Sequence, residues 1–382
     1  MSIYINTYDG ICSLGSNKDE IMQNIFNCKP SATKSQIQSK EFMVGKIENL
    51  QDFSKDIKEI YKTRTNLILH HLLLNMQESI NELFAKFSKD RIAVIIGTTT
   101  TGVEENYQSM HTVESNIFFA RNSLSNPSDF IKDFLGLNSL AFGVSCACTS
   151  GAKVFIEAAR LLNANLCDAV ICGGVDSLNT LTIYGFDSLE ILSQNNALPF
   201  SSSREGINIS EGAALFILSK DIANIKLKGF CANNDAFHIT KPNENFTAQK
   251  DAIMSALKMA NLNSSDIDYI NLHGTGTNAN DKMESNLIND IFTNTPCSST
   301  KGLMGHTLGA AGALEALICA SIIQNSLQNN QSQLPPHYYD GNYDKELPKI
   351  NLTRLNINSK IQNCLSISFA FGGDNSAIIL GV

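Results

Sequence analysis

One cysteine lies where a strand and a helix are expected to meet, a favourable position for a nucleophile. The apolar run Leu140–Val144 predicts a buried strand, and the helical pattern of Ala152–Asn163 follows it, so Cys148 falls on the turn between them. Free N–H groups and the dipole at a helix N-terminus favour a thiolate, which attacks acyl groups. A lone cysteine of this kind is also often a buried core residue. Other motifs must therefore decide between the two interpretations.

Two histidines lie in glycine-punctuated loops. His273 belongs to the run Asn271–Thr277, and His306 belongs to Ser299–Gly312, which also contains Lys301. Glycine lets the backbone approach a ligand closely, although either loop taken singly could be structural. The chain has only seven histidines. Placing two of them in such loops, together with a cysteine on a strand–helix turn, favours a catalytic site. A fourth motif, Ser368–Asn375, carries two more glycines near the C-terminus.

The strands and helices that must position these residues are predicted to form an α/β pattern that is repeated twice. The segment Lys220–Phe230 is a plausible seam, so we expect halves at 1–220 and 221–382, while Ser326–Tyr343 reads as a solvated connector. Each half carries its chemistry on loops after strands, where open α/β sheets place ligands. The expected strands are Ile92–Ile96, Leu140–Val144, Ala169–Cys172, Ala214–Leu218, Ile267–Leu272, Leu365–Phe369 and Ala377–Leu380, and the expected helices include Asn66–Phe84, Ala152–Asn163, Ala252–Ala260 and Ala310–Gln324.

Composition excludes several classes of function. The 382 residues, 43% of them hydrophobic, suffice for a large core, and a net charge of −8 argues against nucleic acid as a partner. No apolar run approaches the roughly 18 residues of a membrane helix. The ten cysteines form neither a disulfide framework nor a metal-ligand spacing, and the N-terminus lacks a signal peptide. We therefore expect a cytoplasmic protein with no metal, no cofactor and no membrane partner.

The four motifs, in this order and at these separations, resemble those of the elongating β-ketoacyl-acyl carrier protein synthases. The resemblance runs from about Ile92 to the C-terminus and includes the stretches Pro199–Gly212 and Asp235–Pro242. It implies the thiolase fold, with five αβαβα layers and two halves related by a pseudo-dyad. It also implies an acyl carrier protein as partner, and either a homodimer or a heterodimer with a related synthase-like subunit.

The resemblance assigns roles to matching positions. Cys148 would take the acyl chain, and His273 and His306 would drive malonyl decarboxylation and stabilise the enolate. Phe371 would be the gate for the acyl chain, and its backbone N–H would form the oxyanion hole with that of Cys148. Lys301 would be held by acids, for which the candidates are Asp281, Glu284 and Glu315.

Two further expectations are less direct. Thr100, in the loop after the strand Ile92–Ile96, would lie in the acyl pocket, and Lys62 and Arg64 would dock the acidic carrier. An ordinary strand-end loop and a solvated helix face are the respective alternatives. Ala370 and Asp374 replace a frequent glycine and threonine of the family. The stretches Cys148–Lys153 and Cys167–Leu178 resemble synthases of the aryl-polyene-type subgroup.

The predicted reaction is the decarboxylative Claisen condensation of an acyl-enzyme with malonyl-acyl carrier protein, in fatty acid, polyene or polyketide chain elongation. One alternative is a non-catalytic chain-length partner subunit, which typically lacks the cysteine. Another is a thiolase-type acyltransferase, which would need a second catalytic cysteine near the C-terminus, where Cys364 precedes the last motif.

Overall fold

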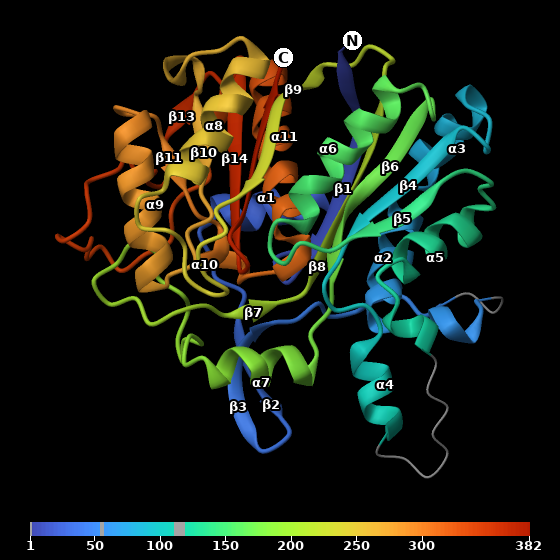
Figure 1. The fold of residues 1–382 in the computed structure, drawn as a ribbon, viewed down its shortest axis with the longest axis horizontal. Coiled ribbons are helices and arrows are strands. Elements are labelled where there is room, and N and C mark those ends of the chain that lie inside the picture. Colours follow the sequence, from blue (N-terminus) through green and yellow to red (C-terminus); the bar gives the residue numbers. More distant parts are fainter. Residues whose placement is uncertain (1, 54–56, 111–118) are drawn as a thin grey trace.

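The computed structural model describes residues 2–53, 57–110 and 119–382. Its main feature is a ten-stranded sheet to which the two parts of the chain contribute neighbouring sets of five strands (Figure 1). The strands in sheet order are β11 (Cys297–Ser298), β10 (Tyr269–Asn271), β14 (Asn363–Ala370), β15 (Asp374–Gly381), β9 (Ile225–Asn234), β1 (Ile3–Cys12), β8 (Gly212–Ser219), β6 (Ala169–Asp176), β4 (Ile92–Gly97) and β5 (Ala141–Val144).

The two sets of strands repeat one topology. If the five strands of a set are numbered in chain order, their order across the sheet is 1-5-4-2-3 in both sets. In both sets the first two pairings in this order are antiparallel and the last two are parallel. The sets meet where β1 pairs with β9 in antiparallel fashion, Ile3–Ile5 opposite Ile225–Leu227. Two identically connected sheets joined by an antiparallel contact are related by an approximate two-fold axis, which confirms the expected pseudo-dyad.

Helices fill the space between and outside the two sets, giving the five expected layers (Figure 1). The central layer is α6 (Ser150–Asn163) with α11 (Ala311–Asn329), which share one core with strands from both sets. Helices α2 (Arg64–Asn75) and α5 (Asn126–Leu135) cover the outer face of the first set. Helices α8 (Thr247–Ala260) and α9 (Asn278–Ile291) cover that of the second.

The remaining elements surround this framework. A small sheet joins β2, β3 and β7 beside helix α7, on the side of the molecule from which the connections before α6 and α11 emerge (Figure 1). These elements are α1 (Lys18–Phe26), β2 (Thr33–Ile37), β3 (Lys40–Gly45), α3 (Gln77–Lys86), α4 (Val103–Met110), α7 (Thr180–Ser188), β7 (Ile209–Ser210), α10 (Lys301–Met304), β12 (Ser332–Gln333) and β13 (Asn358–Ser359).

Helix α11 corrects two expectations. The segment Leu308–Asn329 is long and apolar enough to cross a membrane, contrary to our expectation, but 89% of its most apolar stretch is buried inside the molecule. A helix surrounded by both sheets needs apolar residues on all its faces, which explains its composition. The helix also extends to Asn329, and Leu334 and His337 beyond it are buried. The segment Ser326–Tyr343 is therefore not a solvated connector.

Candidate active site

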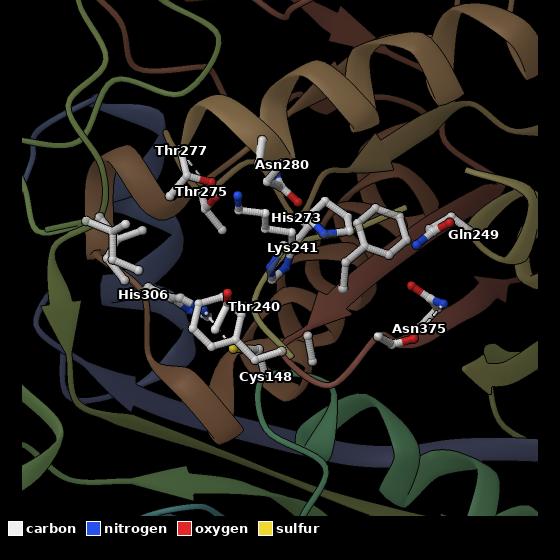
Figure 2. A pocket seen from close by; sticks show the side chains of 18 of the residues that line it. Cys148, Thr240, Lys241, Gln249, His273, Thr275, Thr277, Asn280, His306 and Asn375 are labelled. Carbon is white, nitrogen blue, oxygen red and sulfur yellow. Dashed lines mark hydrogen bonds between the residues drawn. The ribbon is translucent and has the colours of Figure 1, made fainter. Parts of the chain in front are cut away.

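Cys148 lies on a tight connection between β5 and α6. The preceding residue, Ala147, has a φ of 48°, a left-handed conformation that side chains other than glycine rarely adopt. The Ser150 hydroxyl holds this turn, accepting from the Cys146 N–H at 2.8 Å and donating to the Ala147 carbonyl at 2.6 Å. The half-buried thiol is thereby directed into a cavity of about 80 Å³ (Figure 2).

The structure brings both predicted histidines to the same cavity. His306 Nε2 lies 3.1 Å from Cys148 Sγ, and the rings of His273 and His306 are 5.5 Å apart and nearly perpendicular. Each histidine is only 3% exposed. Gly305, with a φ of 76°, ends α10 and turns the chain so that the His306 N–H donates to the Asn208 carbonyl at 2.7 Å.

The protonation of these groups differs in part from expectation. Burial, and after it the positive charge of Lys301, lowers the pKa of both histidines well below its usual value, so both imidazoles are neutral. Removal of the Cys148 sulfur from water raises its pKa to about 12, although Lys301 opposes this shift. Desolvation therefore favours the thiol in the absence of substrate and opposes the effect expected of the N-terminus of α6.

Lys301 is paired by one of the three candidate acids. Its Nζ forms a buried ion pair with Glu315 and lies 3.5 Å from His273 Nδ1. Glu284 instead accepts from the N–H groups of His273 and Gly274, both at 2.7 Å. Glu284 therefore holds the loop that carries His273, rather than the lysine.

Asp281 likewise holds a loop. It accepts from the N–H groups of Phe200, at 2.7 Å, and Gly276, at 3.2 Å. Burial raises the pKa of Asp281 to about 6 and that of Glu284 to about 8. Both carboxyls are positioning groups beneath the histidine loop.

The Phe371 loop closes one side of the cavity. Phe371 is 37% exposed, and its ring lies 5.8 Å from that of Phe186. Ala370 ends β14, and the positive φ angles of the turn fall on Gly372 and Gly373, so replacing the family's glycine by Ala370 imposes no strain. The gate and the oxyanion hole stay predictions.

Asp374 also departs from the family's pattern, and the structure gives it contacts. Its carboxylate accepts from Lys153 Nζ at 2.6 Å and from Thr149 Oγ1 at 3.2 Å. Because Asp374 directly follows the two glycines of the Phe371 loop, this ion pair fastens that loop to the helix after the nucleophile.

Thr100 lies in a buried cluster of polar groups. It is buried, and its hydroxyl donates to Asp176 at 3.0 Å and accepts from the Ser177 N–H at 3.1 Å. Asp176 also accepts from the Gly309 N–H at 2.6 Å, so this cluster joins the loop after β4 to the segment after His306. Thr100 is not among the described residues that line the cavity around Cys148. Its place in an acyl pocket stays a prediction.

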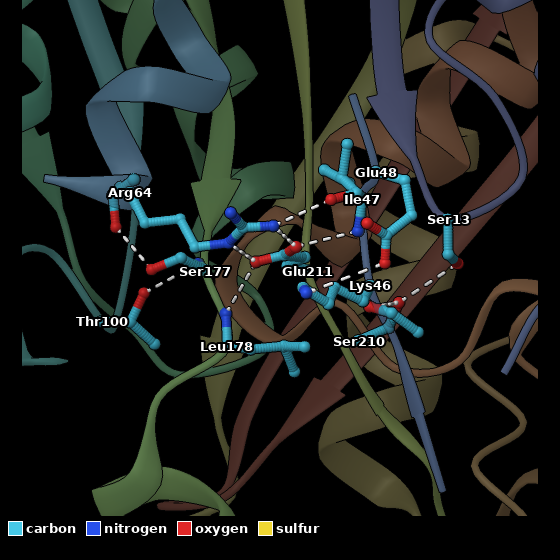
Figure 3. Close-up of polar contacts among 12 residues, drawn as sticks. Ser13, Lys46, Ile47, Glu48, Arg64, Thr100, Ser177, Leu178, Ser210 and Glu211 are labelled. Atoms are coloured by element: carbon cyan, nitrogen blue, oxygen red, sulfur yellow. Dashed lines mark hydrogen bonds and ion pairs between the residues drawn. The ribbon is translucent and has the colours of Figure 1, made fainter. Parts of the chain in front are cut away.

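The proposed docking residues are both engaged in ion pairs. Arg64 pairs with the fully buried Glu211, which also accepts from the N–H groups of Ile47 and Leu178 (Figure 3). Lys62 pairs with Glu59 at 2.9 Å and keeps a half-exposed side chain. Reversing the charge of Arg64 would leave Glu211 buried without its cation. Only Lys62 remains a usable probe of carrier docking.

Sequence reasoning missed His337. This side chain is 5% exposed; its Nδ1 accepts from the Ser299 N–H at 3.2 Å, and its Nε2 donates to the Pro199 carbonyl at 3.0 Å. Ser299 in turn donates to the Gly274 carbonyl at 2.6 Å and accepts from the Lys301 N–H at 3.2 Å. His337 thus connects the loops of His273 and Lys301. The histidine after Pro335 and Pro336 was the available signal, but it lay in a segment interpreted as solvated.

Comparison with known proteins decides the family. The model of the β-ketoacyl synthase N-terminal domain matches residues 3–223, and that of the C-terminal domain matches residues 225–334. The chain belongs to the β-ketoacyl synthase family. This synthase is therefore a condensing enzyme of fatty acid or polyketide chain elongation.

Individual relatives agree with this assignment. The synthase is 32% identical to nodulation protein E of Rhizobium leguminosarum bv. trifolii over 72% of this chain and 71% of the relative. It is 31% identical to 3-oxoacyl-[acyl-carrier-protein] synthase 2 of Coxiella burnetii over 76% and 75%. It resembles the ketosynthase ApeO, solved in complex with its chain length factor ApeC from Xenorhabdus doucetiae, with a TM-score of 0.93, 36% identity, and coverage of 100% and 98%.

The raised pKa of Cys148 predicts how its alkylation depends on pH. Below the pKa the thiolate fraction rises about tenfold per pH unit, so the rate of iodoacetamide adduct formation should climb steadily from pH 7 to 9. Peptide mass spectrometry follows Cys148 separately, and Cys148→Ala gives the background of the other cysteines. A plateau below pH 8 would instead indicate a preformed thiolate–imidazolium pair.

Replacing His337 should impair the reacting groups indirectly. His337→Leu leaves the Ser299 N–H and the Pro199 carbonyl buried without partners, so we expect kcat for malonyl decarboxylation to fall about tenfold. Acylation of Cys148 should change little, and His337→Gln should restore part of the loss. His70→Leu is the matched control, because His70 is buried in the outer layer between Phe53 and Phe134. Equal losses in both half-reactions would contradict a positioning role.

Proposed function

We propose that Cys148 of this synthase is the nucleophile that holds the acyl group covalently during condensation. His273 and His306 are then the hydrogen-bond donors that stabilise the enolate. The observation that carries the proposal is the 3.1 Å contact between Cys148 Sγ and His306 Nε2, with a second neutral imidazole in the same cavity. The oxyanion-hole and gate roles of Phe371 belong to the same proposal.

In the first half-reaction, an acyl thioester transfers its acyl group to Cys148. The thiol passes its proton to His306 Nε2 as the sulfur attacks the thioester carbonyl, because a thiol with so high a pKa is a poor nucleophile until it ionises. A new carbon–sulfur bond to Cys148 forms, the bond to the donor sulfur breaks, and the departing thiolate takes the proton. His306 returns to the neutral form.

In the second half-reaction, the malonyl group loses CO₂. The carbon–carbon bond breaks, and its electron pair forms an enolate whose oxygen accepts a hydrogen bond from the N–H of each imidazole. For His306 this requires the neutral tautomer protonated on Nε2, so its ring proton must move from Nδ1 to Nε2 between the two half-reactions. The Lys301 ammonium faces His273 Nδ1, which places the ring proton on Nε2. The enolate carbon then attacks the acyl carbonyl on Cys148, the bond between that carbonyl and the cysteine sulfur breaks, and the enolate oxygen becomes a carbonyl again. The cysteine thiolate takes up a proton from solvent.

Two other functions fit the site less well. A non-catalytic chain-length subunit would not need Cys148, both histidines and Lys301 assembled in one cavity. A thiolase would need a second cysteine there, whereas Cys364 lies in β14 and is fully buried in the central core.

A partner subunit is supported by the free edge of β5. This edge strand has no neighbour on its outer side among the described strands, all its residues are half-buried, and Leu124 and Leu140 beside it are exposed. A related subunit would cover these apolar groups. We therefore propose a dimer, for which the complex of ApeO with its chain length factor is an analogy, and an acyl carrier protein as donor. We further propose that the synthase belongs to the aryl-polyene-type subgroup and that it is located in the cytoplasm.

Replacing the nucleophile tests the proposal directly. Cys148→Ala should abolish both the acyl adduct and the condensation product, while malonyl decarboxylation persists because both histidines remain. After incubation with acyl and malonyl donors, mass spectrometry of the intact chain detects the acyl adduct, and mass spectrometry of the donor thioesters measures the condensation product and the decarboxylated malonyl donor. Undiminished elongation by the Ala variant would refute the assignment.

The two histidines should differ in their effects. His273→Ala should lower the rate of decarboxylation about a hundredfold or more and spare acylation, since its ring serves only the enolate. His306→Ala should slow both steps, because His306 also contacts the thiol. If both variants acylated at the parent rate, the contact with Cys148 would have no role in proton transfer.

A further inference from the structure

One cation lines the cavity without an established role. Lys241 belongs to the loop after β9, and its side chain lies among Thr275, Asn280 and His273 in the cavity that contains Cys148 (Figure 2). The loop is held in place, since the Gly372 N–H donates to the Ile239 carbonyl at 2.7 Å.

The other charged groups around the cavity already have partners. Lys301 is paired with Glu315, and Lys153 with Asp374. The Asp235 carboxylate, which also lines the cavity, accepts from Phe237 N–H at 3.0 Å, Asn243 N–H at 3.2 Å and Gln249 Nε2 at 3.1 Å. Both histidines are neutral. Within the described residues, Lys241 has no acidic partner.

We propose that Lys241 binds an anionic group of the incoming thioester. This inference rests on the proposed function, because it concerns the substrate of that reaction. Two anions of such a substrate could be the ligand: the malonyl carboxylate and the phosphate of the donor's phosphopantetheine arm. Both accept charge-assisted hydrogen bonds from an ammonium group. The hydroxyls of Thr275 and Thr277 and the amide of Asn280 line the same part of the cavity.

The two ligands predict different kinetics. The malonyl carboxylate is lost as CO₂, so an ammonium bound to it stabilises the ground state more than the transition state. Lys241 would then lower KM for malonyl donors without raising kcat. A phosphate is unchanged by the reaction, so its binding would lower KM for every phosphorylated donor, whatever the acyl group.

The test compares the parent with Lys241→Met on four small donors. These are the pantetheine and 4′-phosphopantetheine thioesters of a neutral acyl chain and of malonate. A carboxylate ligand predicts a rise of about tenfold in KM for both malonyl donors only, and a phosphate ligand predicts it for both phosphorylated donors only. Lys241→Arg should retain most of the affinity. Lys258→Met, on α8 outside the cavity, is the matched control.

Three outcomes would overturn the proposal: unchanged KM for all four donors, equal changes that include the uncharged acyl-pantetheine, or an effect seen only with a whole carrier protein. The last would mean a docking contact rather than a ligand in the cavity. Failure of the proposed function is distinguishable, because the parent would then form no adduct on Cys148 with any donor.

Discussion

Keeping two imidazoles uncharged next to a buried lysine is the constraint on which the site depends. A protonated imidazole would no longer accept the thiol proton, and its charge would repel Lys301. Burial and the nearby ammonium both disfavour that state. The lysine in turn stays in the interior only because Glu315 neutralises it, and Ser368 donates to the second oxygen of Glu315. One buried ion pair between α11 and the connection before it therefore sets the chemistry of both histidines.

The duplicated fold explains why these groups meet. Cys148 follows the third strand of the first half, and His306 follows the third strand of the second. The approximate two-fold axis brings these equivalent connections face to face, at the N-terminal ends of the paired central helices α6 and α11 (Figure 1). Asp176 strengthens the contact, because its carboxylate binds both the loop after β4 and the Gly309 N–H. The two halves of the fold share one topology, but their equivalent connections carry different reacting groups, a cysteine in the first half and a histidine in the second.

The loops around the cavity carry features particular to this chain. The ion pair of Lys153 with Asp374 fastens the Phe371 loop to α6, and the neighbouring loop adds Lys241. These charged side chains surround a floor that is largely buried and neutral. On the proposal made for Lys241, the charge of the substrate is bound by this lysine, and the reacting atoms are handled by groups without net charge.

The amino-acid sequence by itself determined the local features. Apolar periodicity located most of the central strands and helices, and the cysteine on a strand–helix turn and the two histidine loops are visible as short motifs because each depends on neighbours within a few residues. Strands β1 and β9 were missed, although they join the two halves. Their pairing links residues more than two hundred positions apart, and no local pattern records it.

Only the tertiary structure decided which partner each charged group has and how strongly it is desolvated. Glu315 rather than Asp281 or Glu284 neutralises Lys301, Arg64 forms an ion pair with the buried Glu211, and burial raises the pKa of Cys148. His337 acquired its position in the same way, through contacts with Pro199 and Ser299. The choice of charge partner and the size of a pKa shift depend on the distance between segments that are remote in the chain and on how completely water is excluded between them. Neither the distance nor the exclusion of water can be read from the order of residues.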